Sequence, residues 1–124
     1  MIVNEKGFIE IEIKELINWK EEEGCIVSDK ITKEGYKVGF MYREKPDEGK
    51  SDSGWRFFAG NETEEYVNDS RNYHIFALNT ISNYDSDIIP YLNSKIGSKY
   101  IRINSKEFEV DDGTKRIFIE KQKG

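Results

Sequence analysis

The sequence of 124 residues has one cysteine, one histidine and two prolines, and it has no long hydrophobic run. Cys25 alone cannot form a disulfide within the chain, and His74 alone excludes a metal site built on two histidines. No apolar segment approaches the ~20 residues that a membrane-spanning helix needs, and no secretory leader is visible at the N-terminus. We therefore expect a cytoplasmic protein with no membrane association.

Basic charge is also scarce, since 19 basic residues face 24 acidic ones and leave a net charge of -5. A protein that binds nucleic acid usually presents a basic face to the phosphates, so we expect no nucleic-acid partner. An acidic surface suits a basic protein partner, because opposite potentials speed their encounter. It also suits a protein whose charge serves solubility alone. The acidity is concentrated in residues 1–24, with a net charge of -4, and in residues 44–70, with a net charge of -5.

Aromatic residues are abundant, at 13% of the chain, although the hydrophobic fraction is only 36%. Large rings bury much area per residue, so they favour a folded domain over a disordered chain. A chain of this length fits a single domain that needs neither a disulfide nor a metal to stay folded.

The local patterns predict more strands than helices. Alternating or β-branched apolar residues predict strands at 25–28, 36–43, 54–60, 73–78, 99–103, 107–110 and 116–120. Helical spacing or capping residues predict helices at 12–22, 61–67 and 85–93, after a strand or extended lead at 8–13.

Turns and caps join these elements. Asn61 and Asp87 are expected as N-caps of the second and third helices, a turn at 31–35 ends at Gly35, and Asp112-Gly113 is expected to form a tight turn. The charged residues 44–53 are expected to form an exposed loop within a long hairpin. The prediction is an α+β fold, in which two or three helices pack against a mostly antiparallel sheet with little room for parallel crossovers.

Residues that could carry out catalysis are few. Cys25 and His74 would form a nucleophile and base if the fold joined them, but Cys25 begins an apolar strand, where a buried, inert thiol is the ordinary interpretation. The paired carboxylates have simpler roles as caps, turns or solvated faces. The glycines match no phosphate-binding loop, and no calcium loop is complete. We therefore expect no enzyme, no metal and no cofactor.

The stretch from Gly54 to Glu62 is the densest in large side chains. In a strand, Trp55 and Phe57 point to one face while Arg56 and Phe58 point to the other. One interpretation is a central core strand in which Arg56 pairs with an acidic residue of the next helix, either Glu62 or Glu65. The other is that Trp55 and Arg56 reach the surface and anchor an interface, since both residue types are enriched in binding hot spots.

Five segments also carry a resemblance: CIVSDKIT at 25–32, GYKVGFMYR at 35–43, SGWRFFAGNE at 53–62, LNTI at 78–81 and DIIPYL at 87–92. In their order and wording they resemble the immunity protein 33 family, a bacterial domain formerly of unknown function. The resemblance covers about residues 25–112, with Asn61 where an acidic residue is expected. It implies a domain at 25–124, with residues 1–24 as a strand or helix extension packed on it.

The resemblance implies a small cytoplasmic protein of a polymorphic toxin system, which neutralises a cognate toxin made by kin and carries no catalytic residues. Together with the acidic charge, it leads us to expect a non-catalytic protein that binds a basic toxin domain directly. The expected partner-binding residues are Arg43, Asp47, Glu48, Trp55, Arg56, Glu62, Glu65 and Tyr66. The alternative is a regulatory or small-ligand-binding domain with a pocket lined by Trp55, Tyr42 and Tyr66.

Overall fold

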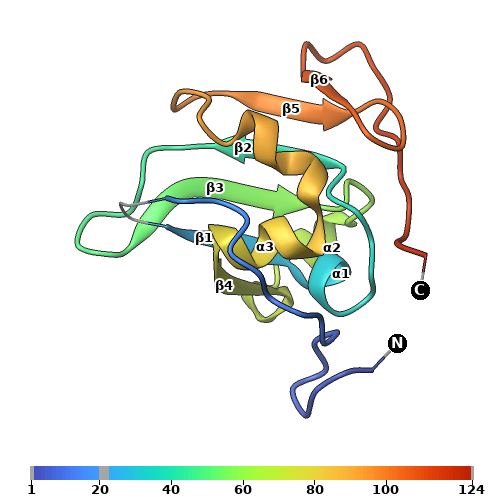
Figure 1. The fold of residues 1–124 in the computed structure, drawn as a ribbon. Coiled ribbons are helices and arrows are strands. Elements are labelled where there is room, and N and C mark those ends of the chain that lie inside the picture. Colours follow the sequence, from blue (N-terminus) through green and yellow to red (C-terminus); the bar gives the residue numbers. More distant parts are fainter. Residues whose placement is uncertain (1, 20–22, 124) are drawn as a thin grey trace.

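Six strands form one mixed sheet in the computed structural model, which describes residues 2–19 and 23–123 (Figure 1). The strands are β1 (Gly24–Ser28), β2 (Phe40–Arg43), β3 (Asp52–Phe58), β4 (Tyr73–Ala77), β5 (Lys99–Arg102) and β6 (Phe108–Val110). Their order across the sheet is β4-β1-β3-β2-β5-β6. The helices are α1 (Asp29–Thr32), α2 (Glu64–Val67) and α3 (Leu78–Tyr84), with two 3-10 helices, η1 (Ser70–Asn72) and η2 (Ser86–Tyr91). The predicted α+β class is confirmed.

The sheet contains a parallel pair, β1 with β3, which the sequence analysis did not expect. The other neighbouring strands of the described chain are antiparallel, including the predicted hairpin of β2 and β3. The parallel pair needs no long crossover helix, because α1 and residues 33–39 carry the chain past the place that β3 will occupy. The β2–β3 hairpin then returns β3 into the gap beside β1.

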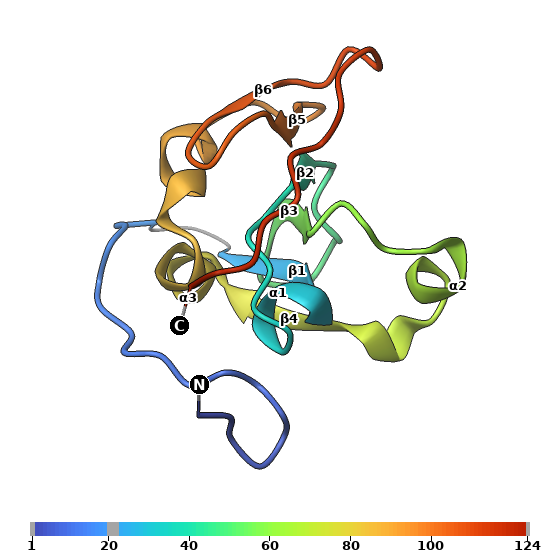
Figure 2. The same cartoon turned by 90° about the vertical axis from the view of Figure 1, so that its right-hand side faces the viewer.

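One face of the sheet packs on α3 and η2 and forms the hydrophobic core. Trp55 and Phe57 are fully buried on this face of β3, as the predicted alternation requires, and their rings stack with centroids 5.9 Å apart. The residues buried with them include Val27, Met41, Leu78, Ile81, Ile88 and Leu92. Figure 2 shows α3 and η2 on this side of the sheet and α2 on the other side. We call the second side, which α3 and η2 do not cover, the open face.

Arg102 lies inside the core, and the sequence analysis did not single it out. Its side chain is 0% exposed, and its Nη2 and Nη1 atoms lie 2.7 Å from Asp85 Oδ2 and 2.9 Å from Asp87 Oδ2. Its Nε donates to the Val38 carbonyl oxygen at 2.7 Å, and the Val38 N–H donates to Asp85 Oδ2 at 2.8 Å. This buried network ties β5 to η2 and to the segment that precedes β2.

The N-terminal segment is extended and contains no helix over residues 12–19, so the helix predicted at 12–22 is wrong there; residues 20–22 lie outside the described part. The strand-like pattern at 8–13 yields one bridge, between Val3 and Ile9. The helical spacing was misleading because side chains of α3 bind this backbone instead. The Asn79 carboxamide accepts from Leu16 N at 2.8 Å, and Asn83 accepts from Lys14 N at 3.0 Å.

Helix boundaries differ from the prediction because other residues act as caps. Thr63 Oγ1 accepts from Tyr66 N at 3.1 Å, so α2 begins at Glu64 and Asn61 does not cap it. The helix predicted at 85–93 is the shorter η2, capped by Asp85 and not by Asp87. Helix α3 was not predicted, and its first residue, Leu78, was expected in the preceding strand. That strand, predicted at 73–78, is confirmed as β4.

Strand lengths also differ. Of the strand predicted at 36–43, only β2 forms a ladder, and Tyr36 makes a single bridge to Lys121. Residues 116–120, which are all described, form no strand. Phe118 N donates to the Arg102 carbonyl oxygen, and the backbone carbonyl oxygen of Glu120 accepts from Lys37 N. The strand predicted at 54–60 begins at Asp52, so the exposed loop covers 44–51 only.

Candidate functional site

Cys25 and His74 belong to neighbouring strands but have separate partners. The Cys25 thiol is buried and donates to the Phe76 carbonyl oxygen at 3.3 Å, while His74 Nδ1 lies 2.7 Å from Asp29 Oδ1. Burial raises the pKa of the Cys25 thiol far above its usual range, with Arg56 only partly opposing that effect. A protonated thiol is a weak nucleophile, so the geometry gives no support to a catalytic pair.

The state of Cys25 leads to a direct prediction. In the folded protein, Cys25 should react with iodoacetamide at least 100-fold more slowly than in the urea-unfolded chain, an order-of-magnitude expectation for an inaccessible, protonated thiol. Mass spectrometry of timed, quenched samples measures both rates. Rapid labelling of the folded chain would show that the thiol is accessible and would reopen the question of a nucleophile.

Within 2–19 and 23–123, no group of three or more His, Cys, Asp or Glu side chains is placed to hold a metal ion. Over the same ranges, no helix has the length and apolar character to cross a membrane.

Trp55, one of the expected partner-binding residues, does not reach the surface. It is 0% exposed, and its Nε1 donates to the Leu92 carbonyl oxygen at 3.0 Å. The interpretation of Trp55 as a surface anchor is therefore wrong, because the ring fills the core under η2. Arg43 points to the same side, where its Nε and Nη1 donate to the carbonyl oxygens of Ser53 and Ser94 at 2.9 Å each.

Arg56 is buried on the open face and forms an ion pair, but not with the residues that were expected. Its Nη1 and Nη2 each lie 2.8 Å from a different oxygen of Asp52, and its Nε lies 2.6 Å from Glu44 Oε2. The bidentate hydrogen bonds from Arg56 hold the pKa of Asp52 far below its usual range. Glu62, a predicted partner, instead accepts from the N–H groups of Ala59 and Gly60 at 2.8 Å.

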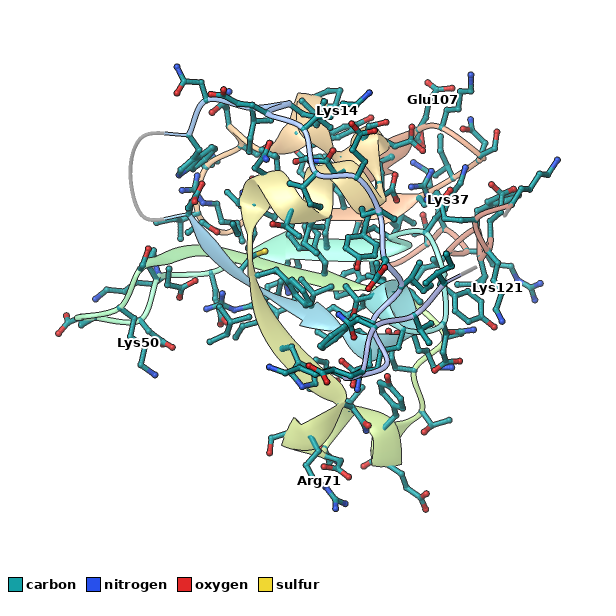
Figure 3. The ribbon with its side chains drawn as sticks, turned by 60° about the horizontal axis from the view of Figure 1, so that its bottom comes forward. Lys14, Lys37, Lys50, Arg71, Glu107 and Lys121 are labelled. Carbon is teal, nitrogen blue, oxygen red and sulfur yellow. The ribbon has the colours of Figure 1, made fainter. Side chains whose placement is uncertain are left out.

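The remaining expected residues lie on two separate segments. Asp47 and Glu48 are exposed in the β2–β3 loop, whereas Glu62, Glu65 and Tyr66 lie on or just before α2. Figure 3 shows the two segments projecting from different corners of the sheet, with Lys50 on the loop and Arg71 just after α2. The structure thus does not gather the expected residues into one site.

Aromatic side chains occupy the open face between these two segments. Tyr42 and Phe58 stack with centroids 5.9 Å apart and an interplanar angle of 11°, and Phe40 lies 5.7 Å from Tyr42. Tyr73 makes an edge contact with Phe58 at 5.8 Å and with Tyr66 of α2 at 6.3 Å. We call these five partly exposed residues the ring surface. Tyr42 and Tyr66 were expected to line a pocket together with Trp55, but Trp55 points to the opposite face.

The tyrosines of the ring surface have raised pKa values. Burial is the main cause for Tyr42, Tyr66 and Tyr73, and it raises the pKa of Tyr73 to about 12. Nearby carboxylates add to the effect: Glu44 acts on Tyr42, while Glu62 acts on Tyr66 and Tyr73. Carboxylates therefore lie near the ring surface at both ends, although burial dominates the pKa shifts.

Tyr73 gives a prediction for alkaline solution. Its pKa in the folded protein, about 12, is above the unfolded value of 10, so the fold favours the neutral phenol. This contribution to stability is fully present below pH 10 and is lost as the pH rises towards 12. An ultraviolet titration of tyrosinate should show a late component that disappears in Tyr73→Phe. Titration of every tyrosine near pH 10 in the folded chain would contradict the structure.

Fold and surface together define a small α+β domain with an acidic, ring-lined face, and its described residues show no assembled reactive centre. The family model described as "Immunity protein Imm33 domain" matches residues 25–111, and the chain therefore belongs to this family of immunity proteins. The resemblance stated from the sequence is confirmed. No curated protein and no solved structure matches the chain. Immunity proteins as a class are generally non-catalytic, and their partner is a protein, a toxin.

Proposed function

We propose that this chain is an immunity protein that neutralises a cognate bacterial toxin by binding it directly in the cytoplasm of the producing cell. The observation that carries the proposal is the family match over residues 25–111. The distribution of charge supports it. Residues 44–70 hold eight acidic and three basic residues, so their net charge of -5 equals that of the whole chain. The remaining acidic and basic residues cancel.

A concentrated negative charge favours a basic toxin domain as the partner. Opposite potentials steer two proteins together and can raise the association rate by orders of magnitude. A toxin that acts on nucleic acid is a natural candidate, because such enzymes present basic surfaces to an anionic substrate. An acidic protein bound on that basic surface would exclude the substrate from it. Neutralisation then needs no chemistry, only a stable complex.

The alternative of a small-ligand domain loses the pocket on which it rested. Tyr42 pairs with Arg56 across β2 and β3 and points to the open face, whereas Trp55 points into the core. These side chains lie on opposite faces of the sheet, so they cannot line a common pocket. We therefore retain toxin binding as the single proposed function.

Co-expression tests the proposal. The toxin domain encoded beside the gene for this chain would be induced in a sensitive strain with the wild-type chain or with an empty vector. We expect growth with the wild type only, and co-purification of toxin and wild-type chain in equal amounts. Absence of a toxin gene there, failure to protect, or protection without a complex would contradict the proposal.

A further inference from the structure

We propose that the ring surface is the docking site for the toxin, and that it receives a lysine- or arginine-bearing segment of that partner. This inference rests on the proposed function and specifies where and through what chemistry the complex forms. The contact then centres on the aromatic surface between the β2–β3 loop and α2. These two acidic segments form the rim of the interface.

The β2–β3 loop and α2 flank the ring surface on the open face. The face between them includes Tyr42 and Phe58, and Ile26 of β1 lies beside Arg56 of β3. At one end, the β2–β3 loop closes against β1 and β4 around a hollow of about 140 Å³, which is lined by Ile26, Asp47 and Ile75 among others. At the other end stands α2, on the opposite side of the sheet from α3 (Figure 2).

Apolar area is available on the open face. Ile75 lies opposite Ile26 in the register of β4 and β1, so it belongs to the same face, and its side chain is 74% exposed. Rings together with an exposed isoleucine form the kind of apolar centre that protein interfaces bury. Hot spots cluster at such centres, and the surrounding polar contacts mainly exclude water. The exposed loop carboxylates of Asp47 and Glu48 are then expected to steer the encounter more than to hold the complex.

Charge identifies the occupant as cationic. Residues 44–70, which carry a net charge of -5, supply the β2–β3 loop, α2 and the central strand β3, whereas the rest of the chain sums to zero. Glu44 lies beside Tyr42 with its side chain half-exposed, although its Oε2 already pairs with Arg56 Nε at 2.6 Å. A partner with an acidic or neutral segment would leave the net negative charge of residues 44–70 uncompensated on binding.

Aromatic rings add a second reason for a cation. The face of a tyrosine or phenylalanine ring attracts an ammonium or guanidinium group, more strongly once water is excluded. The molecule already contains such a contact at the edge of the ring surface, where Lys30 Nζ lies 5.5 Å from the centroid of Tyr66. The stacked pair of Tyr42 and Phe58 lies farther along the same face, where we expect a side chain of the partner to make the equivalent contact.

Hydroxyl-radical footprinting of the wild-type protein tests the site without any substitution. The probe is the toxin domain encoded beside this gene, carrying an inactivating substitution in its active site. We expect oxidation of Tyr42, Phe58 and Tyr66 to fall several-fold in the complex. Phe8, which packs on His74 and Phe76 at the other side of β4, is the internal control and should keep its rate. Protection of Phe8, with unchanged rates at the ring surface, would overturn the inference.

Variants test the chemistry. Tyr42→Lys replaces a ring with a cation, and we expect it to weaken toxin binding by about 30-fold or more, as for a central hot spot. Glu12→Lys is the matched control: it adds the same side chain at a residue whose side chain is 79% exposed, on the N-terminal segment that runs over α3 (Figure 2). It should change affinity by less than about threefold, as for an exposed charge far from the interface. Circular dichroism confirms that each variant is folded.

The outcomes separate the inference from the proposed function. If the wild type does not bind the toxin at all, the proposed function fails. If it binds, but Tyr42→Lys binds as tightly while folded and the footprint lies elsewhere, only the docking site is wrong. If the ring surface is protected in the chain alone as its concentration rises, a second copy occupies the face and the inference is overturned.

Discussion

Replacing Arg102 with alanine is expected to lower the free energy of unfolding by about 3–5 kcal/mol, the usual cost of removing one partner from a buried ion pair. Arg102 is fully buried and contacts two carboxylates and the Val38 carbonyl oxygen. The total free energy of unfolding of a domain of this size is about 5–15 kcal/mol. The variant should therefore be largely unfolded in urea concentrations that leave the wild type folded. Urea denaturation followed by tryptophan fluorescence measures the difference.

The stability lost in Arg102→Ala should depend on pH, because the Asp85 carboxyl group stays buried without its arginine partner. Burial raises the pKa of Asp85, and Arg102 is the main influence that lowers it again. Without the arginine, the folded state disfavours the Asp85 carboxylate, so the variant loses more stability as the pH rises above the ordinary Asp value. Arg116→Ala, at an exposed arginine, is the control and should stay within about 0.5 kcal/mol of the wild type. Equal stability of the two variants would contradict the buried network.

Trp55→Ala is the second substitution with a large expected effect, again about 3–5 kcal/mol, because it removes a large buried ring and leaves a cavity. The variant also leaves the Leu92 carbonyl oxygen without its indole donor. Differential scanning calorimetry measures the loss. A variant that stays as stable as the wild type but no longer binds the toxin would show that Trp55 acts at the surface, contrary to its burial.

Trp55→Phe separates packing from hydrogen bonding at this position. The phenyl ring keeps much of the buried area but cannot donate to Leu92, so the loss should be smaller, about 1–3 kcal/mol. Toxin affinity of the folded variant should match that of the wild type. A large change in affinity at unchanged stability would again place Trp55 in the interface.

Several elements were predictable from local pattern alone. The strands β1 and β4 and the β2–β3 hairpin follow from runs of apolar and aromatic residues whose alternation survives in the fold. The parallel pairing of β1 with β3 was not predictable in this way, because it depends on where the hairpin inserts and not on any one segment. The N-terminal helix failed because Asn79 and Asn83, more than sixty residues away, bind the backbone there.

The candidate site was only partly predictable for the same reason. Alternation along β3 placed Trp55 and Arg56 on opposite faces, but it could not say which face packs on α3. Pairing of Arg56 with Asp52, four residues earlier, requires the turn of the chain at Gly54, where φ is +90°. The ring surface combines residues of β2, β3, β4 and α2, and only the order of strands in the sheet brings them together.

Inhibition stoichiometry tests the central claim of direct binding most directly. A fixed amount of active toxin domain is titrated with this chain while the toxin's activity is followed. The account predicts a linear loss of activity that ends at one chain per toxin, with tighter binding at low salt because the surfaces are oppositely charged. Complete inhibition by a small fraction of one equivalent, which only a catalyst could achieve, or no inhibition at several equivalents, would contradict it.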